Sequence, residues 1–344
     1  MRTLFTMVLT PAFVTLAVMT EAETPPQTQI SNGVITAAIY LPDAQKGYYR
    51  GTRFDWSGVI GRLEYAGHNY YAPWFTKTDP TVIDFVYRGQ DIVAGPCSAI
   101  TGPVEEFSWG GKALGYDQAK VGGTFVKIGV GVLRKPDTEK YNPYRLYEIV
   151  DSGKWSVKKS ADHIEFTQEL KDPQTGYEYR YSKVVRLVEN RPEMIIEHRL
   201  SNLGRRSIQT SVYDHNFLVL DHQPTGPDFT ITLPFDIQST SPLNQKMAEV
   251  QGKRLLYRKV LENRDTVAAE LSGFGNAPAD YRIAIENSKL RAGLKIAGDR
   301  PLSRMYLWSI RSVLAIEPYI DMSIEPGRDF SWTYDYSYYS LDGK

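Results

Sequence analysis

Apolar and polar residues alternate with a period of two along much of the chain, in short segments separated by Gly, Pro, Asn and Asp. Successive side chains of a β-strand point to opposite faces, so this alternation predicts strands with one buried and one solvated face. Residues that strands favour, the β-branched and aromatic types, are frequent in the same segments. The clearest segments are 123–133, 163–170, 177–188, 193–202, 209–220, 228–235, 281–287 and 292–298.

Helical periodicity is confined to one stretch. Residues 242–265, PLNQKMAEVQGKRLLYRKVLENRD, are the only candidate for a helix, and their second half could also be extended. Residues 172–179 and 201–207 carry the Gly, Asn and Asp residues that are typical of hairpin loops. Because no linker composition appears after residue 30, we expect residues 31–344 to form a single all-β domain, a large antiparallel β-sandwich.

The N-terminal 22 residues have the pattern of a secretory signal peptide. Arg2 supplies the positive start, Leu4 to Met19 form an apolar segment, and Ala22 is a small residue suited to precede cleavage. Pro11 and the short apolar length argue against a spanning helix, and an uncleaved anchor is the alternative. Residues 23–30 then form a polar linker. We therefore expect a secreted or periplasmic protein with no membrane span after cleavage.

The charge balance and the cysteine count exclude several classes of function. The 344 residues include 40 Lys plus Arg and 40 Asp plus Glu, so the formal net charge is zero. Such a chain lacks the basic field that nucleic acid requires, and a neutral or weakly charged ligand is expected. Cys97 is the only cysteine, which excludes an intrachain disulfide. The five histidines are not spaced as a zinc site, so no metal is expected.

Two polar residues in apolar strands are candidates for catalysis. His215 lies in SVYDHNFLVLD, and its neighbours Asp214 and Asn216 should point to the opposite face of the strand. Glu317 lies in VLAIEPYI, where an unpaired carboxylate would be costly to bury. A buried imidazole and a buried carboxyl group can form an acid–base pair, although a buried structural histidine is an equal alternative for His215 alone.

Together these regions resemble the aldose 1-epimerase (galactose mutarotase-like) superfamily. The order of residues 195–221, 298–309, 314–319 and 324–338 follows the family's late motifs, and a weaker similarity occurs in ISNGVITAAIY at residues 30–40. The resemblance covers about the C-terminal third of the mature chain. It implies the mutarotase-like supersandwich fold, His215 as the acid, Glu317 as the base, and a reaction on a small sugar or oligosaccharide that needs no cofactor.

The first half of the chain departs from that family. Typical members have a functional histidine in a His-Gly-Gly stretch, whereas Val121 precedes the two glycines in VGGTFVKIG. The family's Asn-Arg pair is not evident either. In its place stands YYRGTRFDWSGVIGRLEYAGHNYY, in which Arg53, Asp55 and Trp56 could bind sugar hydroxyls and stack on a sugar ring. The alternative is that Trp56 packs in the core.

Further residues complete the predicted site. We expect Asp214 and Asn216, the neighbours of His215, to take part in substrate binding. In TGPVEEFSWGGKALGYDQ, residues 101–118, Glu105, Glu106 or Trp109 could reach the mouth of the pocket, but a solvated loop is the favoured interpretation.

Three functions remain open from the sequence. The first is an aldose 1-epimerase-like enzyme that interconverts sugar anomers. The second is a carbohydrate-binding protein that has lost catalysis, which the missing His-Gly-Gly motif favours. The third is another glycan enzyme on the same fold, a sugar-acid epimerase or a lyase, for which Arg53 could neutralise a uronate carboxylate.

Overall fold

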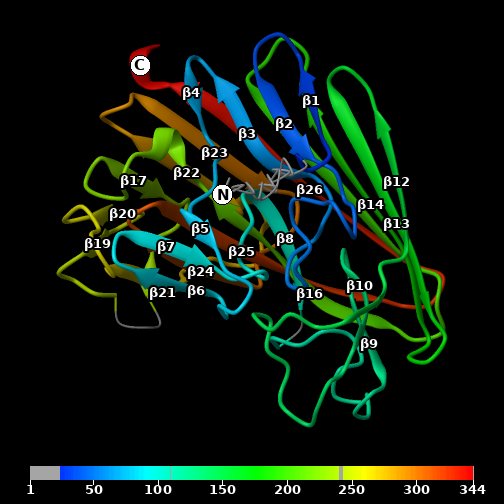
Figure 1. Ribbon diagram of the computed structural model, residues 1–344. Helices are drawn as coiled ribbons and strands as arrows, with labels where there is room; N and C mark the ends of the chain where they lie inside the picture. Colours follow the sequence, from blue (N-terminus) through cyan, green and yellow to red (C-terminus); the bar gives the residue numbers. More distant parts are fainter. Residues whose placement is uncertain (1–23, 109, 240–242, 344) are drawn as a thin grey trace, which may run out of the picture.

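The computed structural model describes residues 24–108, 110–239 and 243–343. Almost all regular structure in this part of the chain is β-strand, arranged in two large antiparallel sheets and three small ones. Figure 1 shows the two large sheets as layers, with the β9–β10 hairpin at one end of the molecule. The predicted all-β sandwich is therefore confirmed.

The larger sheet has ten strands, each antiparallel to its neighbours. Their spatial order is β12 (Lys154–Lys159), β13 (His163–Asp172), β14 (Tyr177–Leu187), β15 (Glu193–Asn202), β26 (Asp329–Ser340), β23 (Ala292–Gly298), β22 (Arg282–Asn287), β17 (Phe229–Thr232), β20 (Arg254–Tyr257) and β19 (Ala248–Gln251). The strand β26 therefore lies inside the sheet, between β15 and β23, both of which end more than 30 residues before it in the sequence.

The second large sheet has six strands and carries the candidate catalytic residues. Its order is β18 (Gln238–Ser239), β21 (Thr266–Ser272), β24 (Arg304–Ile310), β25 (Val313–Ile324), β16 (Ile208–Phe217) and β8 (Gly102–Ser108). All neighbouring strands are antiparallel. Because β16 lies between β25 and β8, segments about 100 residues apart in the sequence are placed side by side.

Three small sheets and three short helices complete the described chain. One sheet contains β1 (Gln27–Ser31), β2 (Thr36–Tyr40), β3 (Val59–Tyr65) and β4 (His68–Asn69). The others contain β11 (Ile149–Asp151), β10 (Gly131–Arg134) and β9 (Thr124–Lys127), and β5 (Lys77–Thr78), β7 (Asp91–Ala94) and β6 (Phe85–Arg88). The 3-10 helices are η1 (Leu220–His222), η2 (Pro278–Asp280) and η3 (Leu341–Gly343).

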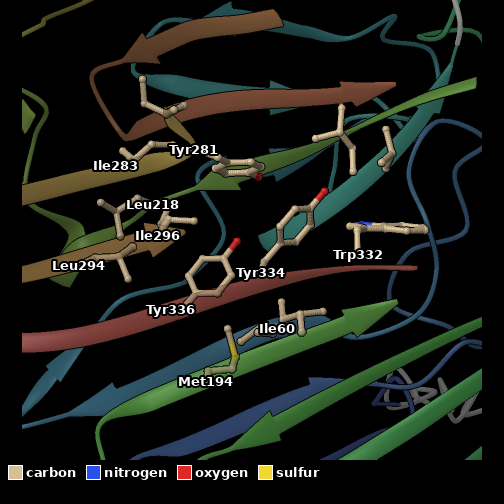
Figure 2. Close-up of a cluster of buried hydrophobic side chains, with 14 of the residues drawn as sticks. Ile60, Met194, Leu218, Tyr281, Ile283, Leu294, Ile296, Trp332, Tyr334 and Tyr336 are labelled. Carbon is tan, nitrogen blue, oxygen red and sulfur yellow. The ribbon is translucent and has the colours of Figure 1, made fainter. Parts of the chain in front are cut away.

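The inner faces of the two large sheets form one continuous apolar cluster. Residues such as Ile164 and Tyr179 of the ten-stranded sheet belong to the same cluster as Val212 and Ile316 of the six-stranded sheet. Figure 2 shows part of this core, in which every second side chain of β26 is a buried aromatic: Trp332, Tyr334 and Tyr336. The period-two pattern of the sequence is thus the pattern of burial.

The helix expected in residues 242–265 is absent from the described residues 243–265, and the extended alternative for the second half is confirmed in β20. Residues 248–257 instead form the hairpin β19–β20, which turns at Gly252 with a positive φ of 58°. Leu255 and Tyr257 are buried on one face of β20, whereas Arg254 is exposed on the other. The alternation of buried and exposed residues in this short apolar stretch therefore determined the local structure. The residues around it with high helix propensity did not produce a helix.

No helix in the described part of the chain is long and apolar enough to cross a membrane. The predicted signal peptide at residues 1–22 lies outside the described residues.

Candidate active site

The strand β16 presents two different polar faces. Tyr213, His215 and Phe217 point to the outer face of the six-stranded sheet, where they line a cavity. Asp214 and Asn216 point to the opposite face, between the two large sheets, where both contact the hydroxyl of Tyr336. The alternation predicted for this strand is therefore present, and it separates His215 from its two polar neighbours.

The cavity on the outer face has a volume of about 730 Å³. Its floor is formed by β16, β24 and β25, and the loop that contains Arg53 forms part of its wall. Aromatic rings and polar groups both line it, including Trp74, Phe85, Tyr144, Tyr306, Trp308, Tyr319, Ser303 and Asp321. A mixed lining of this kind suits a ligand with apolar ring faces and many hydroxyl groups.

His215 and Glu317 meet at the floor of this cavity. Nε2 of His215 lies 3.3 Å from Oε1 of Glu317, and both side chains are less than a tenth exposed. The hydroxyl of Tyr319 donates a hydrogen bond of 3.2 Å to the other carboxyl oxygen, Oε2. The structure thus brings together the two residues that the sequence predicts as an acid–base pair, although they are 102 positions apart.

Aromatic rings surround the imidazole of His215. It stacks on Phe217 with ring centroids 3.6 Å apart, and Phe54 and Trp308 meet it edge-on at 5.7 and 5.9 Å. Nδ1 has no hydrogen-bond partner among the described residues. The ring therefore has one polar contact, which it makes with Glu317.

Burial shifts both members of the pair toward their uncharged forms. It raises the pKa of Glu317 to about 7, with the positive charge of Arg53 acting in the opposite direction. Burial also lowers the pKa of His215 well below its usual value, and Arg53 lowers it further. Near neutral pH the imidazole is uncharged and the carboxyl group is partly protonated, so the pair contains one potential acid and one potential base.

Arg53 is held in the cavity wall by a buried network. Its Nε donates to Oε2 of Glu106 at 2.7 Å, and its Nη2 donates to the hydroxyl of Tyr213 at 3.0 Å. The hydroxyl of Tyr213 donates in turn to Glu106, and Nζ of Lys127 lies 3.2 Å from the same carboxylate. Burial alone would raise the pKa of Glu106, but Lys127 and Arg53 lower it to about 2. Glu106 is therefore a fixed negative charge that orients Arg53.

The favoured interpretation of residues 101–118 as a solvated loop is wrong for Glu105 and Glu106. Both lie on β8 and are at most 4% exposed, because each has cationic partners on its own side of the strand. The sequence signal was available in GPVEEFS, since two adjacent carboxylates within an apolar period-two segment must point to opposite faces. Trp109 lies outside the described residues.

The other predicted binding residues do not line the cavity. Asp55 is fully buried and accepts hydrogen bonds from Ser57, and Trp56 is 2% exposed with its Nε1 donating to a backbone carbonyl at 2.8 Å. Trp56 therefore takes the core position that the sequence left as its alternative. Asp214 and Asn216 are excluded from the cavity by the pleat of β16. Of the residues predicted to bind substrate or reach the pocket, the structure brings Arg53 and Glu106 to the cavity.

A second buried ionic network lies behind the sheet, between the two layers. The ammonium group of Lys183 pairs with Glu105, and it lies 3.7 Å from Asp55. Nε2 of His198 is 2.7 Å from Glu105. Burial raises the pKa of Asp55 to about 6, whereas Lys183 and His198 overcome the effect of burial at Glu105 and lower its pKa to about 2. This network holds β8 against β14 and β15.

Within the described residues, no group of three or more His, Cys, Asp and Glu side chains is arranged to hold a metal ion.

Comparisons with known proteins give structural similarity without sequence similarity. No protein-family model matches the chain, and no curated protein matches its sequence. Several solved structures are similar over nearly their whole length. A protein from Synechocystis sp. PCC 6803 has a TM-score of 0.54 at 13% identity, covering 94% of this chain and 100% of that one.

Two further structures carry names that describe a reaction. A galactose mutarotase related enzyme from Lactobacillus acidophilus has a TM-score of 0.52 at 13% identity, covering 92% of this chain and 99% of that one. A GalM/aldose epimerase homologue from C. elegans has a TM-score of 0.53 at 13% identity, again with 92% and 99% coverage. Identities this low establish a shared fold and leave the activity to be tested. The fold of this chain is therefore the galactose mutarotase-like β-sandwich, in a divergent form.

Proposed function

We propose that this protein is an aldose 1-epimerase-like enzyme that interconverts the anomers of a sugar. The observation that carries the proposal is the contact of 3.3 Å between His215 and Glu317 at the floor of a cavity of about 730 Å³. The opening of a sugar ring requires one group that accepts a proton and a second group that donates one, and a buried pair of this kind provides both. The fold shared with mutarotase-related structures supports the same class of reaction.

The reaction consists of two linked proton transfers. A base removes the proton from the hydroxyl at the anomeric carbon while an acid protonates the ring oxygen. The bond between the anomeric carbon and the ring oxygen then breaks, and an aldehyde forms. Rotation about the adjacent carbon–carbon bond presents the other face of the aldehyde, and the reverse proton transfers close the ring.

The pair can begin this cycle with one proton. The family resemblance assigns Glu317 as the base and His215 as the acid, which requires the proton on the imidazole. Burial favours the proton on the carboxyl group in the empty site. Because Oε1 and Nε2 are 3.3 Å apart, the same proton can reside on either group, and substrate hydroxyls decide which arrangement reacts.

Two neighbours support this chemistry. The hydroxyl of Tyr319 holds Oε2 of Glu317 and leaves Oε1 directed at His215. Nη1 of Arg53 makes no hydrogen bond with the described residues, whereas Nε and Nη2 are both engaged. Nη1 is thus available to donate to a sugar hydroxyl at the cavity wall.

The test is polarimetry on freshly dissolved α-anomers of several aldoses. We expect the wild-type protein to accelerate mutarotation, and Glu317→Gln and His215→Ala to lower kcat by about 10² to 10⁴-fold, the usual contribution of an assisted proton transfer. The matched controls are Glu325→Gln and His163→Ala, since both side chains are substantially solvated and lie away from the cavity.

Binding must be measured on the same variants. Retained sugar binding in Glu317→Gln, seen by saturation-transfer NMR, together with lost turnover would identify catalysis. Sugar binding by folded wild-type protein without acceleration of any aldose would refute the epimerase and leave a carbohydrate-binding protein.

A further inference from the structure

The cavity extends well beyond the acid–base pair. A hexopyranose displaces about six water molecules, or roughly 180 Å³ at ~30 Å³ for each water. The cavity volume of about 730 Å³ is several times larger. Phe217, which stacks on His215, also stacks on Trp74 with ring centroids 6.0 Å apart, and both rings line the cavity. A ligand larger than one sugar ring therefore has room in the cavity beside His215 and Glu317.

Strand register divides the floor of the cavity into three rows of side chains. The inner row contains the acid–base pair and Tyr306, which is directly opposite Glu317 on β24. Side chains on one face repeat every two residues, so successive rows are ~7 Å apart at a rise of ~3.3 Å per residue. The middle row consists of Arg304, Tyr319, Tyr213 and Glu106, and the outer row of Asp321, Ser211 and Ser108.

The middle row has a flat, partly aromatic surface. The guanidinium of Arg304 lies over the rings of Tyr306 and Tyr319, at 5.5 and 5.1 Å from their centroids. The other contact of Tyr319 is a stack on Tyr213 at 4.4 Å. Arg304 also pairs with Glu270 at 3.1 Å, so its charge is already balanced. The row therefore offers a flat surface to a sugar ring, and the exposed carboxylate of Asp321 in the outer row disfavours an acidic ring beside it.

The outer row is polar and open to solvent. Asp321 is exposed, and its Oδ1 accepts a hydrogen bond of 2.8 Å from Ser303. Ser211 faces Asp321 across the strands. Carboxylate and hydroxyl groups at the edge of a flat surface can bind the equatorial hydroxyls of a pyranose ring. The middle and outer rows thus have the surface and the hydrogen-bonding groups to bind a second sugar ring.

We propose that the substrate is a neutral disaccharide or longer glycan, bound by its reducing end. The reducing ring lies at His215 and Glu317, and the next ring lies over Arg304 and is hydrogen-bonded by Asp321. This inference rests on the proposed function, because it uses the acid–base pair to locate the anomeric carbon. It adds a substrate class and an outer subsite formed by the middle and outer rows.

The experiment compares each disaccharide with the monosaccharide of its own reducing ring: cellobiose and maltose with glucose, galactobiose with galactose, and mannobiose with mannose. We expect kcat/KM for mutarotation to be at least tenfold higher for one or more disaccharides than for the matching monosaccharide. Asp321→Ala should lower this ratio to about threefold or less. The control is Asp228→Ala, an exposed aspartate in the turn that precedes β17 of the other large sheet.

The outcomes separate the two proposals. Acceleration of monosaccharides with a ratio near one for every pair overturns the outer subsite and leaves the epimerase. A high ratio that Asp321→Ala does not change also overturns the subsite as described. If no sugar is accelerated, the epimerase fails, and calorimetric titration of the same pairs decides the subsite: tenfold tighter disaccharide binding that Asp321→Ala abolishes supports it, and equal binding overturns it.

Discussion

The acid–base pair shows how burial can prepare two ordinary side chains for proton transfer. The imidazole of His215 has aromatic neighbours and a single polar contact, and the carboxyl group of Glu317 has one phenolic donor. Neither group has a charged partner that would fix its ionisation. Their pKa values therefore move in opposite directions, with that of Glu317 raised to about 7 and that of His215 lowered. The pair carries one proton over the intervening pH range.

The single proton shared by His215 and Glu317 predicts the pH dependence of catalysis. The active pair has one proton, and it loses that proton as the pH rises through the raised pKa of about 7. We expect kcat/KM to be constant from about pH 5.5 to 6.5 and to fall toward tenfold per pH unit above about 7.5. Initial-rate polarimetry, corrected for buffer catalysis, measures this profile. A rate that remains constant to pH 9 would contradict the assignment of the proton to this pair.

The sequence identified the two central residues of the site because each is a polar group within an apolar strand. It offered Glu106 only as a residue that could reach the pocket mouth, and it did not identify Lys127, since the roles of both depend on contacts between strands that are distant in sequence. It also grouped Asp55 with Arg53, although the chain directs only Arg53 to the cavity. The local pattern of the sequence indicates that a side chain is buried. The register between strands that are distant in sequence decides which buried side chains contact one another.

At the scale of single elements, β8 and β16 separate two buried polar networks by the thickness of one sheet. Glu106 faces the cavity and Glu105 faces the space between the layers, and each has its own cations. Each of the eight segments with the clearest period of two contains a strand, because a strand with one buried face repeats its pattern over several residues, although residues 123–133 form the hairpin β9–β10 rather than one strand. The period of two failed for β8, where both faces carry buried groups, and for the β19–β20 hairpin, where the strands are only four residues long.

The network between the layers predicts a large effect of one lysine. Lys183→Met would leave the buried carboxylate of Glu105 without its ammonium partner, and we expect the free energy of unfolding to fall by about 3–5 kcal/mol. Adding Glu105→Gln should recover much of this loss, because the unpaired charge is then removed. Urea denaturation measures both changes, with Lys171→Met at an exposed ion pair as the control. A loss below 1 kcal/mol for Lys183→Met would contradict this account.

At the scale of the whole molecule, buried carboxyl groups make folding stability depend on pH. The pKa is raised to about 7 for Asp214 and Glu317 and to about 6 for Asp55, chiefly by burial. Each group keeps its proton in the folded state at a pH where the unfolded chain is ionised. The folded state therefore binds more protons, and stability falls as the pH rises from the unfolded pKa values near ~4 toward these raised values, and it levels off above them. The buried histidines, with lowered pKa values, oppose this trend below about pH 6.5.

We expect the free energy of unfolding to fall by about 1–2 kcal/mol between pH 6 and pH 8. Denaturant titrations at fixed ionic strength test this. Glu317→Gln should lose about 1 kcal/mol less over the same range, because it lacks one of the titrating groups. Equal pH dependence in the wild type and this variant would show that Glu317 is ionised throughout.

The position of β25 and β26 inside the two large sheets has a consequence for how the protein is made. These strands leave the ribosome after every other described strand, yet β25 inserts between β24 and β16, and β26 between β15 and β23. Until they arrive, the nascent chain exposes unpaired strand edges in both sheets, which are templates for aggregation. A chain that ends at residue 311 should be insoluble when expressed alone and should recover solubility when residues 312–344 are supplied as a separate segment. We therefore expect synthesis of this protein to require protection of the open sandwich until its last two strands close it.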